Sequence, residues 1–137
     1  MVSDSQLKGR SYLIVEDEFL IAFSLANILE EEGARVYGPV SDVKTAMEIF
    51  KEQSFRVDAA ILDISLKGDT VYAFAEHLAS RDIPFVFVTG YDCASTPDSF
   101  RNIPCLSKPC DERELVTLLG QIQSLRGGES AGAMAAP

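Results

Sequence analysis

Short apolar runs alternate with segments of helical periodicity along most of this chain, and this alternation limits the fold more than any other feature of the sequence. The apolar runs have the length of buried strands, and the segments between them repeat apolar residues at helical spacing. Strands that alternate with helices over such short distances predict a parallel sheet with right-handed crossovers and helices on both faces. The sequence therefore predicts an α/β fold made of five strand–helix units.

The same pattern predicts the bounds of the elements. Strands are predicted at 12–15, 34–40, 59–63, 84–89 and 104–107. Helices are predicted at 18–33, 43–53, 70–80 and 111–126, and a weak helical stretch around Pro97 precedes the last strand. Residues 11–126 then form one folded domain, whereas the polar residues 1–10 and the small residues 127–137 are expected to be flexible ends.

Charge and composition exclude several classes of protein. A net charge of -9 repels nucleic-acid phosphates and anionic membrane surfaces, so protein partners and cations are favoured. The apolar runs are too short for a signal peptide or a membrane span. The three cysteines, Cys93, Cys105 and Cys110, are odd in number and lack metal-binding spacing. They are therefore predicted to be unpaired packing residues of a protein in a reducing cytoplasm.

Polar residues follow four of the five predicted strands at the point where each strand ends. Glu16 and Asp17 follow the first strand, Asp63 ends the third, Thr89 ends the fourth, and Lys108 follows the fifth. In open parallel sheets the ligand binds beyond the carboxyl ends of the strands. These side chains are therefore expected to converge at one edge of the sheet.

Such a convergence has a chemical consequence. Carboxylates that are 4 Å apart repel each other by roughly 4 kcal/mol per pair at an effective dielectric constant near 20, which Lys108 alone does not offset. A site made of oxygen ligands and open to water suits Mg²⁺. An aspartate that faces a metal ion, a lysine and a hydroxyl can attack a phosphoryl group, which predicts Asp63 as a nucleophile.

The ordered set Glu16-Asp17, Asp63, Thr89-Gly90 and Lys108-Pro109 resembles the receiver domain of two-component response regulators over residues 11–126. The resemblance implies a flavodoxin-like fold with strand order 2-1-3-4-5. It also implies that Asp63 accepts a phosphoryl group from a phosphohistidine.

The resemblance assigns roles to further residues of the site. It implies that Asp17 and Asp63 bind Mg²⁺ directly, that Glu16 binds it partly through water, and that the backbone carbonyl of Ser65 completes the protein ligands. Thr89 becomes the switch hydroxyl and Lys108 the phosphate-binding cation.

The resemblance also concerns the residues that follow Thr89 and Lys108 in the sequence. The resemblance places Gly90 directly after the switch hydroxyl and Tyr91 beside the phosphoryl group. It also implies a cis peptide bond before Pro109, although X-Pro bonds in folded proteins are cis only about 5% of the time.

Two features depart from the usual receiver pattern. Receivers usually carry an aromatic residue three positions before the lysine, and that position is Cys105 here. The run Phe87-Val88-Thr89-Gly90-Tyr91 resembles instead a receiver subgroup with Phe-Ala-Thr-Gly followed by an aromatic residue. Tyr91 is therefore the candidate to replace the missing aromatic residue in signalling.

The predicted function is that of a stand-alone receiver. The chain lacks a glycine-rich ATP-binding loop, so the phosphoryl group has to come from a histidine kinase or a histidine phosphotransfer protein. Output is expected through a downstream protein that contacts the fourth helix, the fifth strand and the fifth helix. No nucleic-acid or membrane binding is predicted, and the chain is expected to catalyse only its own phosphoryl transfer and dephosphorylation.

Two alternatives belong to other classes. One is an aspartyl-phosphate hydrolase of the haloacid-dehalogenase type, which needs a second acid where this chain has Ser65. The other is a binding module that works without phosphorylation. Taken singly, the acids are also typical of helix starts and turns, and only their order along the chain favours the receiver.

Overall fold

A computed structural model describes most of the chain. The described residues are 6–51, 56–64, 70–90, 93, 96–109 and 111–128. Five parallel strands form one sheet in the order β2-β1-β3-β4-β5. The predicted α/β flavodoxin-like fold and its strand order are therefore confirmed.

The elements follow the predicted order, with small differences at their ends. The strands are β1 (Ser11–Val15), β2 (Arg35–Val40), β3 (Ala59–Asp63), β4 (Phe85–Thr89) and β5 (Cys105–Ser107). The helices are α1 (Phe19–Glu31), α2 (Val43–Phe50), α3 (Thr70–Ser80) and α4 (Glu112–Gly128). In the described part of the segment between β4 and β5, the weak helical stretch around Pro97 includes the 3-10 helix Asp98–Phe100.

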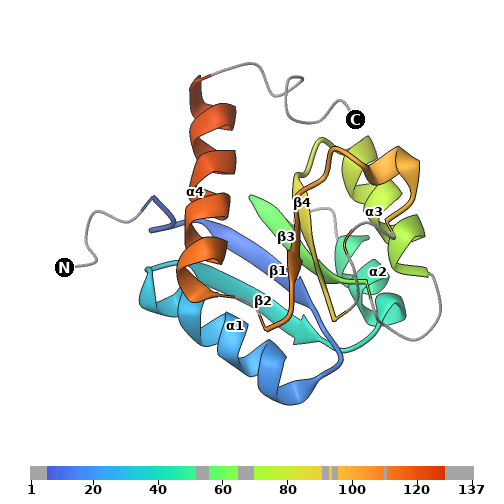
Figure 1. The fold of residues 1–137 in the computed structure, drawn as a ribbon, viewed down its shortest axis with the longest axis horizontal. Helices are drawn as coiled ribbons and strands as arrows, with labels where there is room; N and C mark the ends of the chain where they lie inside the picture. Colours follow the sequence, from blue (N-terminus) through green and yellow to red (C-terminus); the bar gives the residue numbers. More distant parts are fainter. Residues whose placement is uncertain are drawn as a thin grey trace.

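The sheet is covered on both faces, with α1 and α4 on one side and α2 and α3 on the other (Figure 1). Successive side chains of a strand point to opposite faces, so each strand contributes to both halves of the core. The half under α2 and α3 takes Leu13, Val15, Ala60, Leu62, Phe85 and Phe87 from the strands. The half under α1 and α4 takes Tyr12, Ile14, Ala59, Ile61, Val86 and Val88. This two-sided burial explains why the strands read as continuous apolar runs.

Residues 7–10, directly before β1, are more ordered than their composition indicates. Leu7 is 0% exposed and packs in the core half under α1 and α4. The N–H of Gly9 donates a hydrogen bond of 2.9 Å to the carbonyl of Gly33, and the N–H of Arg10 donates one of 2.9 Å to the carbonyl of Leu7. Residues 7–10 therefore belong to the folded domain, in contrast to the expectation of a flexible segment over 1–10.

Replacement of Leu7 by Ala tests this packing. Leu7→Ala is expected to lower the free energy of unfolding by about 3 kcal/mol, because it leaves a cavity under the sheet. Urea denaturation followed by circular dichroism measures the change. The control is Leu20→Ala, which removes the same atoms from a side chain that is 80% exposed and is expected to change little. Equal effects of the two variants would contradict the buried position of Leu7.

Candidate functional site

The predicted site residues converge at the carboxyl edge of the sheet. Glu16 directly follows β1, Asp63 ends β3 and Thr89 ends β4, and these three polar residues are 3%, 1% and 1% exposed. Asp63 pairs in parallel register with Val88, so Thr89 lies one residue further along the neighbouring strand. The edge thus combines buried polar side chains from separate strands, as the sequence predicted.

Three carboxylates form a compact cluster at this edge. One carboxylate oxygen from each of Glu16, Asp17 and Asp63 lies within 4.8 Å of the other two. Asp17 is exposed, so the cluster opens to solvent on one side. Oε1 of Glu16 is buried and has no hydrogen-bond partner among the described residues, and a buried acceptor left in this way costs free energy. An oxygen-rich cluster with an unsatisfied buried acceptor fits a hard divalent cation.

Lys108 is the basic residue that contacts this cluster. Its Nζ lies 3.0 Å from Oε2 of Glu16, 3.2 Å from Oδ2 of Asp63 and 3.1 Å from Oε1 of Glu18. The lysine side chain is 9% exposed and those of Glu16 and Asp63 are buried, so solvent screens these two ion pairs weakly, whereas Glu18 is exposed. The N–H of Lys108 donates a hydrogen bond of 2.8 Å to the carbonyl of Thr89, which ties the lysine to the end of β4.

The crowding of charge shifts the pKa values of two groups. Burial, together with the contact to Asp63, raises the pKa of Glu16 to about 7, although the N–H of Glu18 and the ammonium of Lys108 oppose the rise. Burial alone lowers the pKa of Lys108, but its contacts with Glu16 and Glu18 and the charge of Asp63 raise that pKa above its ordinary range. The negative charge of the carboxylate cluster is therefore larger than the positive charge of Lys108 that partly neutralises it.

The remaining predicted site residues have different outcomes. The peptide bond between Lys108 and Pro109 is cis, as the resemblance implied. Gly90 is exposed, and a Cβ atom added there meets nothing within 4 Å. Ser65 and Tyr91 lie outside the described residues, so their roles stay predictions.

One site contact was missed by the sequence prediction. Glu18 pairs with Lys108 at 3.1 Å, and the run of three acids from Glu16 to Glu18 was the signal that pointed to it. The prediction used only the first two acids, because nothing local indicates which of them faces the lysine.

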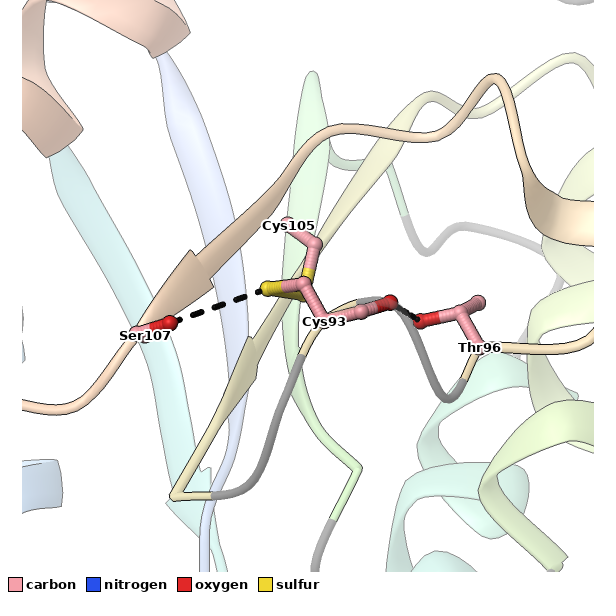
Figure 2. The surroundings of a disulfide bond; sticks show 4 residues. All are labelled: Cys93, Thr96, Cys105 and Ser107. Carbon is pink, nitrogen blue, oxygen red and sulfur yellow. Dashed lines mark hydrogen bonds between the residues drawn. A yellow bond between two sulfur atoms is a disulfide. The ribbon is translucent and has the colours of Figure 1, made fainter.

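Two cysteines beside the site differ from the prediction. Cys93 and Cys105 form a disulfide bond that joins the segment after β4 to the start of β5 (Figure 2). The prediction that they are unpaired packing residues is therefore wrong. The Cα atoms of the two cysteines are 5.9 Å apart because the chain returns alongside β4, a proximity that cysteine spacing does not reveal. Cys110 lies outside the described residues.

Comparison with known proteins agrees with this geometry. The sequence profile of the response regulator receiver domain family matches residues 12–120. The solution structure of SdrG from Sphingomonas melonis Fr1 has 39% identity and a TM-score of 0.69, and the match covers 86% of this chain and 98% of that one. The BeF3-activated conformation of SdrG from Pseudomonas melonis Fr1 has 38% identity and a TM-score of 0.69, with coverage of 88% and 98%.

One curated relative, PdtaR, matches a shorter part of this chain than the SdrG structures do. The transcriptional regulatory protein PdtaR of Mycobacterium tuberculosis is 34% identical over 83 residues, which are 60% of this chain and 40% of PdtaR. The matched segment thus spans less than half the length of that relative. None of the described helices combines the length and the apolar character that crossing a membrane requires.

The fold, the acidic edge and the sequence match lead to the same family. The profile match covers well over half of the chain, and the acids and the lysine stand at the strand ends where the resemblance required them. The family consists of signal-transduction domains of two-component systems and not of ordinary enzymes. The chain belongs to the response regulator receiver domain family.

Proposed function

We propose that the chain accepts a phosphoryl group on Asp63 from the phosphohistidine of another protein. The observation that carries this proposal is the position of Asp63. Its carboxylate is buried at the sheet edge, lies within 4.8 Å of the carboxylates of Glu16 and Asp17, and is 3.2 Å from the ammonium of Lys108. A carboxylate that belongs to an acidic cluster and contacts a lysine is suited to attack phosphorus once the negative charge of the cluster is neutralised.

The residues of the cluster fit Mg²⁺. Asp17 and Asp63 would hold the ion directly, Glu16 partly through water, and the backbone carbonyl of Ser65 would complete the protein ligands. When bound, Mg²⁺ neutralises the carboxylates and the charge on the transferred phosphoryl group. The buried Oε1 of Glu16, which lacks a hydrogen-bond partner among the described residues, supports this assignment.

The side chains around Asp63 have separate tasks in the transfer. A carboxylate oxygen of Asp63 forms a bond to phosphorus while the bond from phosphorus to the donor's imidazole nitrogen breaks, and the electron pair of that bond returns to the imidazole. Lys108 supplies a buried ammonium for a charge-assisted hydrogen bond to a phosphoryl oxygen. The hydroxyl of Thr89 donates a second hydrogen bond, which draws Thr89 and the following loop inward.

Output follows from this movement through protein contact. The responding surface consists of the segment after β4, β5 and α4, and a surface hollow of about 550 Å³ lies between β5 and α4. Its lining includes Leu106, Leu118 and Arg113, so the hollow offers a partner both apolar and charged groups. Tyr91 takes the signalling role of the aromatic residue that Cys105 replaces.

The wider setting of the chain is part of the proposal. The chain is proposed to be a receiver that stands alone, which the match over 98% of the solved SdrG chain supports. Its proposed membership of the Phe-Ala-Thr-Gly subgroup rests on the run Phe87-Val88-Thr89-Gly90-Tyr91 in the sequence. The proposed compartment is the cytoplasm, and the partners are a histidine kinase or phosphotransfer protein and a downstream protein. Neither nucleic acid nor a membrane is a proposed partner.

Incubation of the protein with acetyl phosphate tests the proposal. With Mg²⁺ present, we expect one phosphoryl group per chain on the peptide that contains Asp63, detected by peptide mass and by a phosphate-affinity gel. Chelation of the metal should prevent labelling. Rapid turnover of many phosphoesters without stable labelling indicates a hydrolase instead, and no labelling indicates a binding module.

An apolar patch beside the site is the proposed contact for the phosphohistidine protein. Phe19, Leu20 and Phe23, at the start of α1, are 75%, 80% and 55% exposed, and the rings of Phe19 and Phe23 stack with centroids 5.8 Å apart. The patch begins two residues after Asp17, and a protein that delivers phosphate to Asp63 has to cover the surface around the acids.

Removal of the rings of Phe19 and Phe23 should therefore slow phosphoryl transfer from a protein donor and leave transfer from a small-molecule donor unchanged. In the variant Phe19→Ser/Phe23→Ser, transfer from a histidine kinase that labels the wild type is expected to slow about 30-fold, because the loss of two aromatic anchors costs about 2 kcal/mol. Labelling by acetyl phosphate, which needs no docking surface, should keep its rate and serves as the internal control. Equal loss with both donors would show a damaged site instead of a lost contact.

A further inference from the structure

The disulfide between Cys93 and Cys105 joins two segments that both lead into the proposed phosphorylation site. Cys93 lies four residues after Thr89, and Cys105 lies three residues before Lys108. Within the sheet, Cys105 pairs with Phe87 and Ser107 pairs with Thr89. The covalent bond therefore connects the chain that leaves the switch threonine to the strand that directly precedes the lysine.

The contacts of Cys93 place it against β5. Its sulfur lies 3.9 Å from the hydroxyl oxygen of Ser107, and its carbonyl accepts hydrogen bonds of 2.7 Å and 3.1 Å from the hydroxyl and the N–H of Thr96 (Figure 2). The disulfide thus fixes the start of the segment that connects β4 to β5.

The far end of the same segment is held by apolar packing. Phe100 is buried, and its ring centroid lies 5.5 Å from that of Phe87 and 5.4 Å from that of Tyr72. Packing of this kind persists whatever the state of the cysteines. Reduction therefore frees Cys93 from Cys105, while Phe100 stays in the core.

The disulfide is open to small reagents. Both cysteines are half-buried and line a surface hollow of about 430 Å³ together with Thr96, Phe100, Arg101 and Ile103. Thiol–disulfide exchange requires that an attacking sulfur reach one of the two bonded sulfurs, and the hollow provides that access. In the reducing compartment proposed for this chain, such a pair is held as thiols until an oxidant arrives.

We infer that Cys93 and Cys105 form a reversible redox lock that ties Cys93, four residues after Thr89, to β5, and this inference rests on the proposed phosphorylation of Asp63. The oxidant is a small disulfide such as oxidised glutathione. One cysteine thiolate attacks it and releases one glutathione thiolate. The second cysteine thiolate then attacks the mixed disulfide and releases the other. The two cysteines lose two electrons, which the glutathione disulfide gains, and their two protons pass to solvent or to the released thiolates.

The lock acts on the movement that phosphorylation requires. In the proposed function Thr89 moves inward to the phosphoryl group, and the disulfide holds Cys93, four residues after Thr89, against β5. The oxidised protein therefore populates the phosphate-accepting arrangement less often than the reduced protein. We expect labelling by acetyl phosphate to be about fivefold slower in the oxidised state, the lower end of typical coupling between two sites.

The test compares the full chain after treatment with oxidised glutathione and after treatment with dithiothreitol. Alkylation and peptide mass report which cysteines are paired, a phosphate-affinity gel gives the labelling rate with Mg²⁺ and acetyl phosphate, and amide hydrogen exchange reports the freedom of residues 89–105. The double variant Cys93→Ser/Cys105→Ser should label at the reduced rate under both treatments. The matched control Cys110→Ser should keep the full difference between them.

The outcomes separate the lock from the proposed function. Pairing of Cys93 with Cys105, slower labelling and slower amide exchange in the oxidised state support the lock. The proposed lock is overturned if Cys93 and Cys105 do not pair. It is also overturned if the rates of labelling and of amide exchange are the same in the oxidised and the reduced protein. If Asp63 is labelled in neither state, the proposed function is wrong, and so is the proposed effect of the disulfide on phosphorylation. In that case the comparison of amide exchange alone decides whether the disulfide restrains the residues after Thr89.

Discussion

Asp63→Asn is expected to abolish labelling by acetyl phosphate and, in the absence of metal, to make the fold more stable. The variant removes the proposed nucleophilic oxygen, so no stable phosphoryl group should appear on the chain. It also removes one of three carboxylates whose oxygens lie within 4.8 Å of one another. Burial is the main cause that raises the pKa of Glu16 to about 7, and Asp63 adds to the rise. The variant removes the contribution of Asp63, so the metal-free site becomes less unfavourable.

The stability change is measured by thermal melting in the presence of a chelator. We expect the melting temperature to rise by about 4 °C, which corresponds to about 1 kcal/mol in a domain of this size. Added Mg²⁺ should stabilise the wild type more than the variant, because the variant has lost a ligand. Asp98→Asn is the control, since Asp98 is an exposed acid outside the cluster and its replacement should affect neither labelling nor the response to metal. A less stable Asp63→Asn protein would contradict the charge crowding described here.

Lys108→Met is expected to have the largest effect on stability. The ammonium of Lys108 is 9% exposed and lies within 3.2 Å of carboxylate oxygens of both Glu16 and Asp63. Removal of one partner from a buried ion pair leaves the other charge uncompensated and costs about 3–5 kcal/mol. Methionine retains much of the apolar volume of the lysine, so the loss reports charge more than packing.

The loss in Lys108→Met should grow with pH. A carboxyl whose pKa is higher in the folded than in the unfolded protein makes the fold less stable as the pH rises from the unfolded to the folded pKa. Glu16 is such a group, with a pKa raised from 4.5 to about 7 by burial and by Asp63. Without the lysine that pKa rises further, so the metal-free variant should fall further below the wild type at pH 8 than at pH 5.

Urea denaturation at both pH values measures this dependence. Lys51→Met is the matched control, because Lys51 is exposed and its replacement should change stability little at either pH. The same unfolding midpoint for the Lys108 and Lys51 variants would show that the buried ion pairs contribute nothing to the fold. Labelling of Lys108→Met by acetyl phosphate should also be slower, because the phosphoryl oxygens lose a charged partner.

Much of the fold was predictable because its signals are local. Buried strands of a parallel sheet read as continuous apolar runs, and the bounds predicted for β3 and α3 agree with those observed. The site residues were predictable for a related reason. Asp63, Thr89 and Lys108 each stand at the end of a strand, and parallel strands bring their carboxyl ends to one edge whatever their separation in sequence.

Other features depend on neighbours that no local pattern identifies. Leu7 stands in a polar segment, yet its side chain fills a place between the sheet, α1 and α4. Glu18 reaches Lys108 across 90 residues of sequence, and Cys93 meets Cys105 because the chain doubles back beside β4. The peptide bond between Gly38 and Pro39 is cis, again without a signal in the residues around it.

The sequence by itself thus determined the order of strands and helices and the chemistry present at the strand ends, because hydrophobic periodicity and residue type are properties of neighbouring positions. Tertiary structure alone decided which acid pairs with the lysine, which cysteines meet and where the N-terminal leucine packs. These contacts join residues that are distant along the chain, and their distances are set only when helices and sheet pack into one core.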